Sequence, residues 1–87
     1  MTDTSAISRD VQAYILQEFL PGENPDNLTE STALMTSGIL DSIASLKLVD
    51  FLEEKYDIQV EAHDLNLNNF NTIADIASYV HSKLPKA

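Results

Sequence analysis

The residues best placed to do chemistry are Asp41 and Ser42, which stand where a polar loop gives way to a strongly periodic segment. A serine at the start of a helix projects its hydroxyl into solvent, beside backbone N–H groups that have no partner within the helix. A phosphate ester on that hydroxyl would lie at the positive end of the helix dipole, where anions are favoured. The placement suits attachment of a phosphate-linked group, and it equally suits an ordinary helix cap.

Other chemistries find little support in the sequence. His63 and His81 are separated by 18 positions, and neither has a histidine four residues away, so we expect surface histidines and no metal site. Ser42 lacks the glycine two positions to either side that a nucleophile elbow needs, and no residue can be assigned as its base. We therefore expect a protein that is not an enzyme, with a Ser42-dependent hydrolase as the weaker hypothesis.

Composition limits the class of protein and its partners. The 87 residues predict one domain spanning 1–87, and the absence of cysteine excludes disulfides and thiolate metal sites. A net charge of −9 disfavours binding to nucleic acid and anionic membranes and favours binding to basic protein surfaces. The same acidity could instead serve only to keep the domain soluble. No apolar run approaches the ~20 residues that span a bilayer, and no signal peptide precedes Asp3, so we expect a cytoplasmic protein.

The first half of the chain predicts a helix followed by a long loop. From position 7 apolar residues recur at spacings of three and four, at Ile7, Val11, Tyr14, Ile15 and Phe19, while Ser8 falls among the polar positions. Residues 1–5 are polar and are expected to fray. Pro21-Gly22 ends the helix, and residues 21–41 form a loop with a short helical turn expected near 32–35.

The segment from Ser42 to Tyr56 predicts a second helix. Its core stripe is expected to contain Ser45, Leu48, Val49, Leu52 and Tyr56. The opposite stripe mixes charged and apolar side chains: Ile43, Lys47, Asp50 and Glu54, flanked by Ala44, Leu46 and Phe51. Such a stripe beside Ser42 suggests a docking surface, or a solvated face that carries a few apolar residues.

The last third predicts turns and a final helix. Residues 57–60 are partly extended, 61–65 suggest one or two helical turns, and the asparagine-rich run 66–71 suits turns and caps. Thr72 and Asp75 have the spacing of a capping box before an apolar stripe that ends at Pro85. We therefore expect an all-α fold, a small bundle of three main helices plus one short helix.

The stretch Gly38-Ile39-Leu40-Asp41-Ser42-Ile43 resembles the attachment motif of acyl and peptidyl carrier proteins, (G/L)-x-D-S-L, and the resemblance extends over essentially the whole chain. It implies that Ser42 carries 4′-phosphopantetheine, whose thiol holds an acyl or aminoacyl group as a thioester. It also implies that Asp41 supports the magnesium-dependent step of the phosphopantetheinyl transferase. The implied docking residues are Leu40, Ile43, Ala44, Leu46, Lys47, Asp50 and Glu54.

Two positions depart from the pattern of fatty-acid-synthase carriers, which usually have acidic residues two and five positions after the serine. This chain has Ala44 and Lys47 there. The resemblance thus points to a freestanding, monomeric carrier for secondary-metabolite biosynthesis, served by an acyl- or aminoacyl-activating ligase and downstream biosynthetic enzymes. The alternatives are a carrier of primary fatty acid synthesis and a helical interaction module that has lost the modification.

Overall fold

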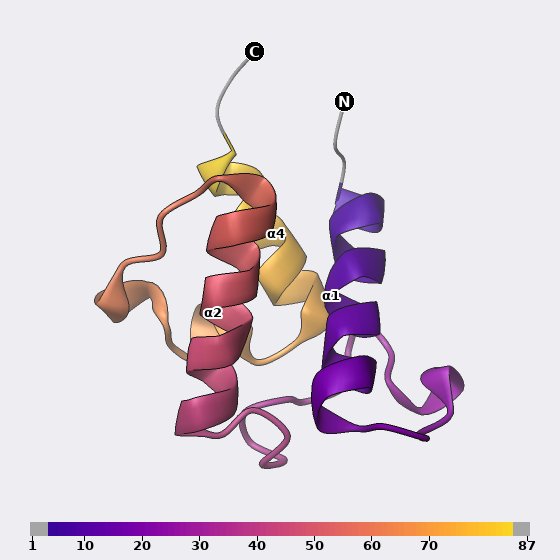
Figure 1. The fold of residues 1–87 in the computed structure, drawn as a ribbon. Coiled ribbons are helices and arrows are strands. Elements are labelled where there is room, and N and C mark those ends of the chain that lie inside the picture. Colours follow the sequence, from indigo (N-terminus) through magenta and orange to yellow (C-terminus); the bar gives the residue numbers. More distant parts are fainter. Residues whose placement is uncertain (1–3, 85–87) are drawn as a thin grey trace.

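The computed structural model describes residues 4–84, without the Pro25 side chain, and over that range the chain forms helices and turns with no strand. Three main helices form a small bundle (Figure 1). The elements in chain order are α1 (Thr4–Phe19), the 3-10 turn η1 (Pro25–Asn27), α2 (Ser42–Tyr56), the 3-10 turn η2 (Ala62–Asp64), α3 (Leu67–Phe70) and α4 (Ile73–Lys83). The expected all-α bundle of three main helices and one short helix is confirmed.

The core lies where α1, α2 and α4 face one another. α1 packs closely along α4 (Figure 1). α2 also contacts α1 and contributes buried side chains to the same core. The residues that fill the core are apolar and almost completely buried: Ile7, Val11, Ile15, Leu28, Leu34, Leu48, Leu52, Phe70, Ile73, Ile76 and Val80. Removing side chains of this size from water is the main stabilising contribution in a domain without disulfides.

α1 begins earlier than its apolar stripe predicts. The helix already includes Thr4, and Ser8, expected on the polar side, is buried next to the core. Tyr14 is half-buried because its ring stacks on Phe51 of α2, with ring centroids 4.2 Å apart, and Phe19 meets Tyr14 edge-on at 5.7 Å. Of the residues expected to fray, 1–3 lie outside the described part of the chain.

α2 has the predicted boundaries, Ser42 to Tyr56. Ser45, Leu48 and Leu52 are buried as expected, whereas Val49 and Tyr56 pack against the core while staying partly exposed. The Tyr56 hydroxyl donates a 2.7 Å hydrogen bond to Asp10 Oδ2, which ties the end of α2 to α1.

The short helical segments agree with the expectation in part. The helical turn expected within 61–65 is present as η2, and a short α-helix, α3, also arises within the asparagine-rich run, where turns and caps were expected. Asn66 makes this possible, because its side chain caps the Asn69 N–H and its backbone carbonyl accepts from Phe70. The predicted cap of the last helix is confirmed, since Thr72 Oγ1 accepts from the Asp75 N–H at 3.1 Å.

The long loop between α1 and α2 is anchored by its own side chains. Leu28, Leu34 and Leu40 are buried in the core. The tight turn lies at residues 35–38, later than the expected 32–35, and is closed by a 3.2 Å hydrogen bond from Gly38 N–H to the Met35 carbonyl. Gly38 has a φ of +89°, a conformation that glycine adopts at no steric cost.

Candidate functional site

Ser42 is the first residue of α2, and its side chain is exposed. Asp41 is the N-cap: its Oδ1 accepts a 2.8 Å hydrogen bond from the Ala44 N–H, and its carbonyl accepts from the Ser45 N–H at 2.8 Å. The cap is therefore supplied by Asp41, which leaves the Ser42 hydroxyl free for another role. The sequence allowed Ser42 to be either the helix cap or an attachment residue, and the structure assigns the cap to Asp41.

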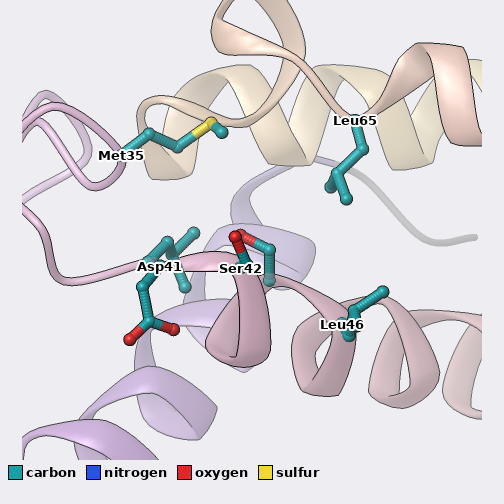
Figure 2. A pocket seen from close by; sticks show the side chains of 7 residues that line it. Met35, Asp41, Ser42, Leu46 and Leu65 are labelled. Atoms are coloured by element: carbon teal, nitrogen blue, oxygen red, sulfur yellow. The ribbon is translucent and has the colours of Figure 1, made fainter.

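A hollow of about 490 Å³ opens beside the Ser42 side chain. Its walls come from the loop before α2, the first turns of α2 and the segment before α3. The lining residues are mainly apolar: Met35, Leu40, Asp41, Ser42, Ser45, Leu46 and Leu65. Figure 2 shows the Ser42 side chain directed toward the space between Met35 and Leu65, while the Asp41 carboxylate points the other way.

This end of α2 suits a phosphate ester. Asp41 engages the N–H groups of Ala44 and Ser45, and those of Ser42 and Ile43 make no hydrogen bond to the described residues. Free N–H groups at the start of a helix favour a negative group. The apolar walls of the hollow offer contact to an organic chain that continues from such a phosphate.

The expected docking residues divide into an exposed set and a buried set. Ile43 and Leu46 are 67% and 59% exposed, unusually high for large apolar side chains. Lys47, Asp50 and Glu54 are exposed along the same side of α2. Leu40 and Ala44, only 3% and 6% exposed, pack into the core, so the expectation that their side chains face a partner is wrong for this structure. Their short distance from Ser42 in sequence does not bring them to the surface.

Several residues of the site were missed in the sequence. Met35, Ser45 and Leu65 line the hollow. Helical spacing predicts Ser45 in the core, which is correct, since Ser45 is 3% exposed and also lines the hollow. Met35 and Leu65 lie in irregular segments, where periodicity carries no signal.

The Leu65 side of the hollow is held by a polar contact. The Tyr79 hydroxyl donates a 2.8 Å hydrogen bond to Asp64 Oδ2, and Lys83 Nζ lies 4.0 Å from the same oxygen. Burial of the ring, followed by the hydrogen bond to Asp64, raises the pKa of Tyr79 to about 12. α4 therefore fixes the residue next to Leu65.

Neither histidine belongs to the hollow. His63 is exposed with Nε2 3.3 Å from Asp64 Oδ1, and His81 is exposed on α4. Among residues 4–84, no three side chains of the metal-binding types come together, and no helix there is long and apolar enough to cross a membrane.

Comparison with known proteins agrees with this geometry. Residues 15–80 match the family model described as phosphopantetheine attachment site. The chain is 33% identical over 67 residues to the probable acyl carrier protein PigG of Serratia sp. (strain ATCC 39006), covering 77% of this chain and 76% of that protein. It is also similar to a chain in a crystal structure of an FAD-dependent dehydrogenase, with a TM-score of 0.74, 27% identity, and 80% of this chain and 97% of that chain covered.

The family match spans most of the chain and agrees with the helical bundle and with an exposed serine at a helix start. The cofactor of this family is covalently bound phosphopantetheine, and its members act as carriers that interact with modifying and biosynthetic enzymes and are generally not catalysts. The chain belongs to the acyl carrier protein family, whose members bear a phosphopantetheine attachment site.

Proposed function

We propose that Ser42 is the attachment residue for 4′-phosphopantetheine and that this chain carries acyl or aminoacyl groups as thioesters on the thiol of that arm. The observation that carries the proposal is the exposed Ser42 side chain at the start of α2, capped by Asp41 and beside the apolar hollow. The arm supplies the thiol that a cysteine-free chain lacks. Residues 1–87 would act as one monomeric, cytoplasmic carrier domain.

The chain's own residues have distinct tasks in this proposal. Asp41 fixes the helix start, and the exposed N–H groups of Ser42 and Ile43 favour the phosphate. Met35, Leu46 and Leu65 provide apolar contact for the arm or its cargo. The carboxylate of Asp41, which is exposed and directed away from the hollow, is available to support the magnesium-dependent step of the transferase (Figure 2).

The pathway is proposed from the charges of α2. Lys47 is exposed five positions after Ser42, where carriers of primary fatty acid synthesis usually have an acidic residue, and Ala44 is buried. A basic enzyme surface that recognises those carriers would meet Lys47 with like charge, which disfavours binding. We therefore favour secondary-metabolite biosynthesis over primary fatty acid synthesis, with Ile43, Leu46, Lys47, Asp50 and Glu54 as the docking residues.

The partners follow from this role. A phosphopantetheinyl transferase would attach the arm, and an acyl- or aminoacyl-activating ligase would load it. The similarity to a chain in a crystal structure of an FAD-dependent dehydrogenase supports a flavin-dependent dehydrogenase as one downstream enzyme acting on the bound cargo.

The attachment is tested by incubating the purified protein with a broad-specificity transferase, magnesium and coenzyme A, then measuring the intact mass. We expect a gain of one phosphopantetheine in the wild type and none in Ser42→Ala. Ser31→Ala is the matched control, because Ser31 is an exposed serine of the same long loop, outside the turn before Ser42, and should leave the gain unchanged. A gain that persists in Ser42→Ala contradicts the proposal.

Cargo class needs a second assay on the modified protein. A fatty-acyl ligase and a set of amino-acid-adenylating enzymes are each offered the holo form, and the mass of the loaded species is recorded. Loading by only one of the two classes assigns the cargo as acyl or aminoacyl. An FAD-dependent dehydrogenase is then tested for a loss of two mass units from the bound group.

A further inference from the structure

Asn71 connects the junction of α3 and α4 to residues 34–41, the attachment loop that leads into Ser42, although the two lie far apart in sequence. Its side-chain Oδ1 accepts hydrogen bonds from the backbone N–H groups of Met35, at 3.1 Å, and Thr36, at 3.2 Å. Its backbone carbonyl accepts a third from the Leu34 N–H, at 2.6 Å. One residue thus binds three consecutive amides of the loop.

A hydrogen-bonded turn links the amides bound by Asn71 to Ser42. The carbonyl of Leu34 accepts a 2.9 Å hydrogen bond from the Leu40 N–H, and both leucine side chains are buried. Leu40 immediately precedes the N-cap Asp41, which in turn precedes Ser42. Because each step is a backbone contact or a buried side chain, the position of Asn71 determines where α2 begins relative to α4.

The same contacts set one wall of the hollow. Met35, whose amide binds Asn71, lines the hollow opposite Leu65, as Figure 2 shows. The opposite wall is fixed separately by the contact of Asp64 with Tyr79. Asn71 therefore controls the Met35 side of the hollow without lining the hollow itself.

The two hydrogen bonds of Asn71 Oδ1 lie near the surface. Thr36 is exposed and Met35 is half-buried, so water can replace Oδ1 at these amides. The turn would then keep its buried leucines but lose the contact that orders residues 35 and 36. Asn71 thus differs from the core residues: its removal loosens the attachment loop more than it destabilises the bundle.

We propose that Asn71 is a positioning residue for modification of Ser42: its side-chain carbonyl orders the attachment loop so that the Ser42 hydroxyl is presented to the transferase. The inference rests on the proposed attachment at Ser42. Asn71 touches neither the reacting hydroxyl nor the arm, and it acts through Met35, Thr36 and the turn that follows them.

The test compares the rate of phosphopantetheine transfer to apo variants at position 71. Asn71→Ala removes the acceptor, whereas Asn71→Asp keeps an oxygen where Oδ1 lies. We expect kcat/KM of the transferase to fall about 10- to 100-fold for Asn71→Ala, as for other small displacements of a reacting group. For Asn71→Asp we expect a value within about threefold of the wild type, because rescue follows the acceptor oxygen.

Two controls separate positioning from folding. Asn68→Ala changes an exposed asparagine of the same segment and should leave the transfer rate unchanged. Hydrogen exchange of the Met35 and Thr36 amides should be slow in the wild type and in Asn71→Asp, and fast in Asn71→Ala. Should Asn71→Ala fail to fold by circular dichroism, Asn71→Ser takes its place, because its shorter side chain cannot reach both amides.

The outcomes distinguish the two proposals. Wild-type transfer rates in a folded Asn71→Ala or Asn71→Ser variant overturn this inference and leave the attachment at Ser42 intact. Fast exchange of the Met35 and Thr36 amides in the wild type also overturns it. A wild-type protein that gains no arm at Ser42 overturns the proposed function and this inference together.

Discussion

The Tyr79 hydroxyl lies 2.8 Å from Asp64 Oδ2, so a residue of α4 holds the turn η2 in place one residue before Leu65. This hydrogen bond joins η2 to α4 across 15 residues of the chain. Because Leu65 lines the hollow beside Ser42, the shape of the site depends on a contact between a phenol and a carboxylate.

The contact predicts a dependence of stability on alkaline pH. The pKa of Tyr79 is raised to about 12 from its usual 10, chiefly by burial and then by the hydrogen bond to Asp64. A raised pKa means that the folded state favours the protonated phenol, so this contribution is complete below pH 10 and is lost as pH rises toward 12. We expect the free energy of unfolding, measured with urea, to decline over that window.

Tyr79→Phe isolates this contribution. At pH 7 the variant should be about 1–2 kcal/mol less stable, since the hydrogen bond to a carboxylate is missing. Its decline between pH 10 and 12 should be shallower than that of the wild type. A residual decline is expected from Tyr56, whose pKa is also raised by burial and by Asp10. Parallel curves for wild type and variant would show that Tyr79 is not responsible.

Two substitutions of Asp41 separate its role as a helix cap from the role of its charge in modification. Asp41→Ala removes the cap on the Ala44 N–H and should cost about 1 kcal/mol of stability, whereas Asp41→Asn keeps an acceptor and should cost only a few tenths. If the carboxylate charge supports the transferase, Asp41→Asn should still be modified about tenfold more slowly, equivalent to about 1.4 kcal/mol. Thermal melting and a transfer time course measure the two effects separately. An Asp41→Asn variant modified at the wild-type rate would limit Asp41 to capping.

Replacing Gly38 should destabilise the protein through its backbone conformation and not through a steric clash. A Cβ at this position would meet no atom within 4 Å, yet the φ of +89° disfavours any side chain. Gly38→Ala should therefore cost about 1–2 kcal/mol, and it should slow modification of Ser42 because it strains the attachment loop. Gly22→Ala is a matched control with a φ of +85° at the far end of the same long loop. It should cost similar stability in urea unfolding and leave the transfer rate unchanged.

Reversing the charge of Lys47 should change which enzymes bind without changing stability. Its side chain is exposed, and the contact it makes with the Tyr14 hydroxyl uses the backbone carbonyl, so Lys47→Glu should alter stability by less than about 0.5 kcal/mol. The substitution should strengthen binding to a basic-surfaced enzyme of fatty acid synthesis, measured by surface plasmon resonance at low salt. The gain should shrink as salt is raised.

Lys55→Glu makes the same charge change on the α1 side of the same helix, where Lys55 Nζ lies 3.9 Å from Asp10 Oδ2. An equal gain in binding for Lys47→Glu and Lys55→Glu would indicate net charge rather than a specific contact. A gain confined to position 47 would support the docking surface proposed for α2.

The sequence predicted the parts of the molecule that follow helical periodicity. The α2 boundaries and the Thr72 cap were correct, because each depends on contacts between residues three or four positions apart. The motif also predicts a helix start at Asp41 and Ser42, and the structure has Asp41 as the N-cap and Ser42 as the first residue of α2.

Two other features do not follow from periodicity. α3 is capped locally by Asn66, three residues before Asn69, but asparagine favours turns as well as caps, so the run does not distinguish the two. Tyr79 is buried against Phe70, with ring centroids 5.3 Å apart, and its hydroxyl contacts Asp64, which lies 15 residues away in the chain. The family resemblance implies that Leu40 and Ala44 belong to the docking surface, whereas core packing turns both side chains inward. Residues near a functional group in the chain need not share its exposure.

The lack of cysteine has a practical consequence for a carrier whose cargo sits on a thiol. In the holo protein, the sulfur at the end of the arm would be the sole sulfhydryl of the entire molecule. A maleimide dye or spin label would therefore attach there and nowhere else, and would report by its mobility whether the arm rests in the hollow or swings free. Cargo would block the label, so the same reagent would count empty and loaded carriers in a mixture.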